Sequence, residues 1–128
     1  MKTKTFVKKY QGRGVEDWTS YMSDSAEQFA KDFKSTVKDI FKDDGIDIVN
    51  WSVGHYFMSG FFKKNDKHVY FSRNIERGYP INLESRDAMF GILVRTAKSD
   101  KDYTGGRNNF TSIKGLRQTV LTLFDDGR

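Results

Sequence analysis

The chain has 128 residues, enough for one domain with a single hydrophobic core, and its eleven Phe, six Tyr and two Trp supply large side chains for that core. Cysteine is absent, which excludes disulfides, thiolate metal sites and cysteine nucleophiles and fits a reducing compartment such as the cytoplasm. No stretch of about 18 uncharged apolar residues occurs, so we expect neither secretion nor a membrane span.

Charge is distributed along the chain in blocks. The net charge is +5. Residues 1–14 carry five cations and no acid, residues 15–50 have a net charge of −5, and residues 51–128 have a net charge of +5. A basic surface attracts polyanions and acidic protein surfaces alike. A protein that imitates DNA needs surplus carboxylates, so this balance argues against DNA mimicry.

The basic residues 1–14 are expected to form an N-terminal arm or edge strand, with residues 15–128 as a single α+β domain. Phe6, Val7 and Tyr10 fit a short strand within the arm, which Gly12 and Gly14 would end.

The next segment has the pattern of an amphipathic helix. Ser25 and Gln28 have the spacing of a capping box, apolar residues recur every three or four positions from Ala26 to Phe41, and Gly45 supplies the stop. The opposite side of this helix carries lysines with acids between them, which is typical of a solvated face.

After Gly45 the apolar period changes to two, which predicts a strand over residues 46–51. Residues 55–63 and 68–73 then flank a turn centred on Asn65 and Asp66, so we predict a β-hairpin. The expected register places Lys63 opposite His68, Phe62 opposite Val69, Phe61 opposite Tyr70, and Gly60 opposite Phe71, where the glycine would make room for the ring.

Residues 74–87 mix the only proline with glycine and charges, which predicts a long connection. Residues 88–96 are apolar enough for a central strand, covered on both faces until Arg95 emerges. Ser112 can cap a second helix that ends near Gly127. Together these elements predict an α+β fold with an antiparallel sheet of about four to five strands and two helices packed on one face.

Residues 98–108 form a polar loop rich in cations between the last predicted strand and the last helix. Gly105-Gly106 permits a tight turn. The cations near this turn outnumber the two acids there, Asp100 and Asp102. This composition suits an anionic partner, although no phosphate-loop signature is present. The six cations around the turn are Arg95, Lys98, Lys101, Arg107, Lys114 and Arg117. The predicted partner-binding residues are Arg95, Lys98, Lys101, Tyr103, Arg107 and Lys114.

No catalytic signature accompanies this loop. We therefore expect no catalytic residues, no bound metal and no cofactor. Glu76, Glu84 and Asp87 are the carboxylates near the sheet that could gather around a metal, but their spacing matches no nuclease signature. The hairpin register keeps His55 far from His68, so the two histidines should not meet.

A different reading uses aromatic rings that lie among cations, as in platforms on which unpaired bases stack. Strand alternation assigns about half of these rings to the core. The rings concerned are Tyr56, Phe57, Phe61, Tyr70, Phe71 and Tyr79.

Residues 53–62, 69–72 and 95–109 together resemble small proteins from phages and conjugative elements of Gram-positive bacteria. The likeness covers about the C-terminal 75 residues. Such genes often encode anti-defence proteins, including anti-CRISPR inhibitors that are small, poor in cysteine and mostly non-enzymatic. The resemblance implies a cytoplasmic protein of a bacterial host that binds and inhibits a host defence nucleoprotein, with a CRISPR effector nuclease as the specific expectation.

Two alternatives remain open at the level of sequence. One is a general DNA- or RNA-binding accessory protein of a mobile element. The other is a small metal-dependent nuclease that uses Glu76, Glu84 or Asp87.

Overall fold

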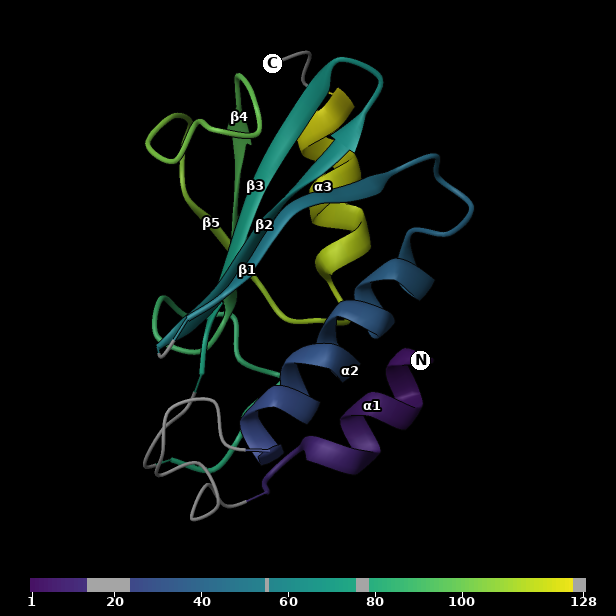
Figure 1. The fold of residues 1–128 in the computed structure, drawn as a ribbon, viewed down its shortest axis with the longest axis vertical. Helices are drawn as coiled ribbons and strands as arrows, with labels where there is room; N and C mark the ends of the chain where they lie inside the picture. Colours follow the sequence, from purple (N-terminus) through teal and green to yellow (C-terminus); the bar gives the residue numbers. More distant parts are fainter. Residues whose placement is uncertain (14–23, 55, 76–78, 126–128) are drawn as a thin grey trace.

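The computed structural model describes residues 1–13, 24–54, 56–75 and 79–125 (Figure 1). The five strands form one antiparallel sheet in the order β1-β2-β3-β4-β5, so neighbours in sequence are neighbours in the sheet. This confirms the α+β class and the antiparallel sheet. The elements in chain order are α1 (Thr3–Tyr10), α2 (Asp24–Ile40), β1 (Asp47–Val53), β2 (Phe57–Lys64), β3 (Lys67–Asn74), β4 (Ile92–Ala97), β5 (Asn109–Thr111) and α3 (Leu116–Asp125).

The hairpin forms with the predicted register. Lys63 pairs with His68, Phe61 with Tyr70, and Gly60 with Phe71. A Cβ atom at Gly60 would lie 3.0 Å from Cε1 of Phe71, so the glycine does make room for this ring. Because the register is set by a short turn and by complementary cross-strand sizes, both signals are local in sequence.

The predicted strand at residues 6–10 is wrong, because these residues belong to helix α1. Phe6 and Tyr10 are four residues apart and therefore lie on one face of a helix. Both side chains are buried, and their ring centroids lie 5.5 and 4.9 Å from that of Phe29 in α2. Contacts with α2, distant in sequence, thus decide the conformation of the basic segment.

Further boundaries differ from the predictions, and one strand is additional. Helix α2 ends at Ile40, and turns follow it as far as Gly45. Strand β4 begins at Ile92 instead of residue 88, because Asp87 caps a turn with its carboxylate, accepting from the backbone N–H of Met89 and Phe90. Strand β5 was not anticipated, and α3 begins at Leu116, after a turn started by Ser112. The predicted roles of Gly14, the Ser25 side chain, His55, Glu76 and Gly127 lie outside the described residues.

One core cluster lies between the sheet and the helices. Figure 1 shows α1, α2 and α3 on the same side of the sheet. The strands contribute alternate residues to this core, as expected for a sheet with one buried face. The strand side chains in the cluster are Met58, Phe62, Val69, Phe71, Ile92 and Val94.

A buried carboxylate joins α1 to α2. Asp32 is only 8% exposed, and its carboxylate accepts hydrogen bonds from Lys9 Nζ at 2.8 Å, the Tyr10 hydroxyl at 2.6 Å and Gln28 Nε2 at 3.0 Å. Burial alone would raise the pKa of Asp32, but these hydrogen bonds outweigh it and hold the pKa below its ordinary value. The charged form is therefore the one that the fold stabilises.

We expect Asp32→Asn to lower the free energy of unfolding by about 2 to 3 kcal/mol at neutral pH, because three donors lose a charged acceptor. The depressed pKa of Asp32 means that its stabilisation is present above the unfolded value near pH 4 and is lost as the pH falls through the lower folded value. Urea unfolding at several pH values checks this. The gap between wild type and variant should close in acid, and a constant gap would contradict the assignment.

Candidate binding surface

The sheet face opposite the helices, called the open face below, is built from the other half of the strand residues. Its register-aligned rows run across the sheet from β1 toward β5. Nearest the β2–β3 turn is the row Asp47, Lys63, His68 and Ala97, and next to it is the row Val49, Phe61, Tyr70 and Arg95.

The predicted functional loop, residues 98–108, folds onto this second row. The Tyr103 ring meets those of Phe61 and Tyr70 edge-on, with centroids 5.3 and 5.9 Å apart. Asn50, at an irregularity in β1 with a positive φ of 53°, donates from Nδ2 to the Asp100 carbonyl at 2.8 Å and to the Tyr103 hydroxyl at 2.9 Å. The loop is therefore fastened to the far edge strand as well as to β4.

Arg95 holds the same loop from below. Its guanidinium lies 4.6 Å from the centre of the Tyr70 ring and donates to the carbonyl of Tyr103 and to Oδ1 of Asn108. These contacts engage both terminal nitrogens of the guanidinium, whereas Nε is buried without a hydrogen-bond partner among the described residues. Arg95 thus positions the loop, although the sequence suggested it as a direct contact with a partner.

Asp102 fixes the backbone inside the loop. Its carboxylate accepts hydrogen bonds from the backbone N–H groups of Lys98 at 2.9 Å, Thr104 at 3.3 Å and Gly105 at 2.9 Å. The bond from Lys98, followed by the others, outweighs burial and keeps the pKa of Asp102 below its ordinary value. An Asp followed three residues later by Gly is a turn signal, so this role was available from the sequence.

Gly106 makes the closest approach to β4. Its φ is +79°, and a Cβ atom there would lie 2.4 Å from the carbonyl oxygen of Thr96. Only glycine combines this conformation with this contact at low cost. The double glycine therefore has a demonstrable structural role, which is to bring the loop against the strand.

Three cations project from this fastened loop. Lys98, Lys101 and Arg107 are exposed, and within the described residues no ion pair or hydrogen bond occupies the side chains of Lys101 and Arg107. By contrast, Lys114 lies in the turn before α3 and Arg117 lies in the first turn of α3, whose buried side chains join the core cluster. Arg117 also forms a two-pronged ion pair with Asp44. The structure thus brings together five of the six predicted partner-binding residues at the loop and places Lys114 elsewhere.

Comparison with known proteins found no relative of this chain. No protein-family model matches the sequence, and neither the curated proteins nor the solved structures include a similar one. No helix within the described ranges is both long and apolar enough to cross a membrane.

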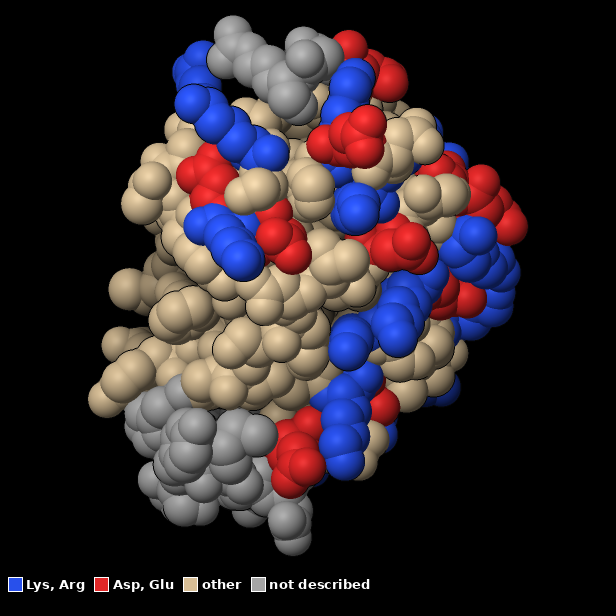
Figure 2. Space-filling view, turned by 45° about the horizontal axis from the view of Figure 1, so that its top comes forward, with Lys and Arg blue, Asp and Glu red and all other residues tan. Residues whose placement is uncertain are grey.

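The charge pattern of the surface is mixed. Figure 2 shows basic and acidic side chains interleaved along the upper and right parts of the view, and a wide area without charges over its centre and left. No broad field of one sign is visible on this side, so local groups of cations matter more than the net charge of +5.

The carboxylates and histidines of the described residues do not form a metal site. Glu84 and Asp87 are exposed, and both Met89 and Phe90 donate backbone hydrogen bonds to Asp87. No group of three or more metal-binding side chains occurs in the parts of the chain that the structure describes. His68 lies opposite Lys63 on the open face, as its register predicted.

The aromatic residues divide between core and surface. Phe61, Tyr70 and Phe71 are buried, whereas Tyr56, Phe57 and Tyr79 have 69%, 48% and 53% of their surfaces exposed. Phe71 belongs to the core beside the helices, whereas Phe61 and Tyr70 are buried on the open face, where Tyr103 of the loop packs on them.

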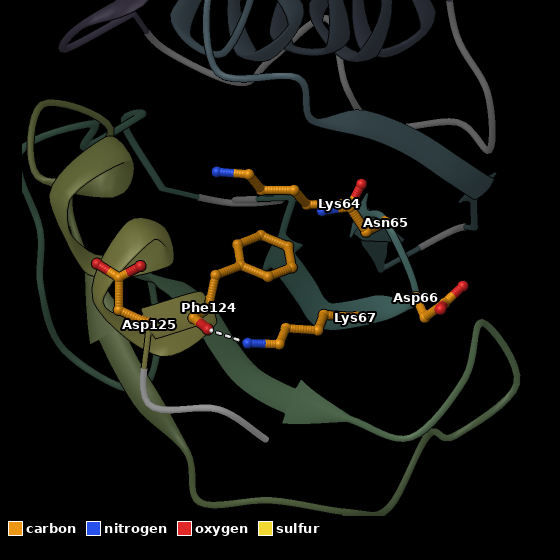
Figure 3. A pocket seen from close by; sticks show the side chains of 6 residues that line it. All are labelled: Lys64, Asn65, Asp66, Lys67, Phe124 and Asp125. Carbon is orange, nitrogen blue, oxygen red and sulfur yellow. Dashed lines mark hydrogen bonds between the residues drawn. The ribbon is translucent and has the colours of Figure 1, made fainter.

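Two cavities lie near these elements. One of about 330 Å³ is lined by residues of the loop and by the adjoining end of β4. The other, of about 270 Å³, lies between the β2–β3 turn and the end of α3 (Figure 3). There Lys67 Nζ donates to the carbonyl of Phe124 at 3.1 Å and so caps the C-terminus of α3, which is a structural role.

Proposed function

We propose that this chain is a non-enzymatic protein of a mobile element that binds and inhibits a host defence nucleoprotein, with an RNA-guided CRISPR effector nuclease as the first candidate. The observation that supports it is the preorganised loop 98–108, which presents Lys101 and Arg107, side chains that no described residue pairs with, on a fixed backbone. The mobile-element origin rests on the sequence resemblance.

Fixing the loop before binding matters energetically. Immobilising a long side chain or a loop at an interface costs about 0.5 to 1.5 kcal/mol per ordered side chain, and a backbone that is already ordered avoids much of this cost. Here Asn50, Arg95 and Asp102 tie down the loop from three sides. The exposed ammonium and guanidinium groups can then contact phosphates or carboxylates of the partner.

The second candidate function is a general DNA- or RNA-binding accessory protein, which the same cations favour. A bare nucleic acid releases counterions when cations bind it, so affinity falls steeply with salt, and each lost contact lowers the log-log slope by about one unit. A protein surface responds to salt more weakly. The two candidates therefore differ in a measurable quantity.

The test uses a panel of purified effector nucleases from Gram-positive bacteria. Cleavage of target DNA is measured with and without this protein, and its binding is measured to each effector alone, to the guide RNA alone and to the assembled complex. We expect cleavage by at least one effector to fall and binding to require the effector protein. Tight binding to bare RNA or DNA without inhibition would instead favour the accessory role.

A further inference from the structure

The next row of the open face carries no charge. It takes one residue from every strand: Ser52, Ser59, Ser72, Leu93 and Phe110. Ser59 is buried, Ser52 is exposed, and Ser72, Leu93 and Phe110 are partly exposed. We call this row the serine row. It lies directly beside the row that the loop covers.

Large apolar side chains follow at the end of the sheet away from the β2–β3 turn. Phe57, 48% exposed, pairs with Asn74 on the open face. Two hydrogen bonds, one between backbone groups and one from the Asn74 side chain, keep further exposed residues close to this pair. The Ile75 N–H donates to the carbonyl of Tyr56 at 2.8 Å, and Asn74 Nδ2 donates to the carbonyl of Met89 at 2.7 Å.

Charged and uncharged surface are thus separated along the open face, where Leu93, Phe110 and Phe57 supply apolar side chains and the serines supply small hydroxyl groups. Loop 98–108 supplies cations at one side of the serine row, whereas the row itself and the Phe57–Asn74 pair have none. The connection near Phe57 carries Arg86 between the acids Glu84 and Asp87. An uncharged centre beside a polar and charged margin is the usual anatomy of a protein interface.

We infer that the serine row and Phe57 receive an apolar segment of a protein partner, whose carboxylates face Lys101 and Arg107. The inference rests on the proposed function, because it takes the loop as part of the interface. It adds the chemical class of the partner, which is a protein segment that combines apolar and acidic residues.

Nucleic acid fits this surface less well. A nucleotide chain carries a charge at every step, so the surface that it follows needs cations along its whole length. On the described open face the cations lie in the loop, in the row that it covers, and at Lys63 near the β2–β3 turn, whereas the exposed ring of Phe57 lies beyond the serine row, away from all of them. A protein segment can keep its carboxylates at one end and bury apolar side chains at the other.

The experiment selects a phage-displayed library of random 12-residue peptides on the intact, immobilised protein. We expect enrichment of sequences that join Phe, Trp or Leu to Asp or Glu.

Synthetic versions of the selected peptides should bind the wild-type protein. The substitution Ser72→Arg places a bulky cation in the serine row and should weaken their binding at least tenfold. Phe57→Ser is a second variant in case Ser72→Arg does not fold. Gln118→Arg adds the same charge on the helix side and should leave binding unchanged.

Absence of enrichment, or peptides that bind Ser72→Arg and Phe57→Ser as tightly as wild type, would overturn the inference. A 20-nucleotide uridine RNA is tested in parallel. If both variants lose RNA binding instead, the surface is a stacking platform and the inference is also wrong. If no effector in the panel is inhibited, the proposed function alone is contradicted, because peptide binding that depends on Ser72 would still support the interface.

Discussion

Replacing Lys101 and Arg107 together by alanine is expected to weaken binding of the proposed nucleoprotein partner at least about 100-fold, since each charge-assisted contact contributes roughly 1.5 to 3 kcal/mol. Both side chains are exposed and neither forms a hydrogen bond or ion pair with any described residue. The free energy of unfolding should therefore change by no more than about 0.5 kcal/mol. Titration of the partner and urea unfolding measure the two quantities.

A matched control removes two charges elsewhere. Lys31 and Lys38 are exposed on α2, so Lys31→Ala with Lys38→Ala lowers the net charge equally on the helix side. If the control weakens binding as much as the loop variant, general attraction explains the effect. If the loop variant binds like wild type, the assignment of the site to loop 98–108 is wrong.

Gly106→Ala is expected to weaken binding at least about tenfold although every charge is kept. The new Cβ would lie 2.4 Å from the Thr96 carbonyl oxygen, and φ is +79°, so the loop must move away from β4. Strain of this kind costs on the order of 1 to 3 kcal/mol, which the protein relieves by displacing the loop and its cations. Binding affinity and amide hydrogen exchange of residues 98–108 report the two consequences.

Gly45 provides the control for this substitution. Its φ is +67°, but nothing lies within 4 Å of a Cβ atom there, so Gly45→Ala carries the backbone cost without the clash. We expect a loss of about 1 kcal/mol in stability and unchanged binding. Unchanged affinity in Gly106→Ala, together with faster exchange in the loop, would show that preorganisation contributes nothing to recognition.

The predictions from sequence succeeded where the deciding interactions are close along the chain. Helix α2 follows from its apolar period, although it ends at Ile40, and Gly45, which does adopt a positive φ, ends the turns that follow the helix. The β2–β3 register follows from a two-residue turn centre and from the fit of Gly60 to Phe71. In each case the contacts are made within one turn of helix or across one hairpin.

Composition led to loop 98–108 as a hypothesis for the site, but it did not predict the internal organisation of the loop. The sequence placed cations around Gly105-Gly106, and the structure divides them by role. Arg95 donates a hydrogen bond to the Tyr103 carbonyl inside the protein, whereas the side chains of Lys101 and Arg107 are exposed to solvent. Asn50, which holds the loop from the opposite edge of the sheet, gave no signal because its partner lies 50 positions away.

Sequence alone thus determined the fold class, helix α2, the hairpin and the loop that carries the cations, since periodicity and turn chemistry act over a few residues. Tertiary structure decided that residues 3–10 are helical, because Phe29 and Asp32 receive Phe6 and Tyr10. It also decided which face of the sheet stays open and which cations reach solvent. Those outcomes depend on contacts between distant segments, and no local pattern encodes them.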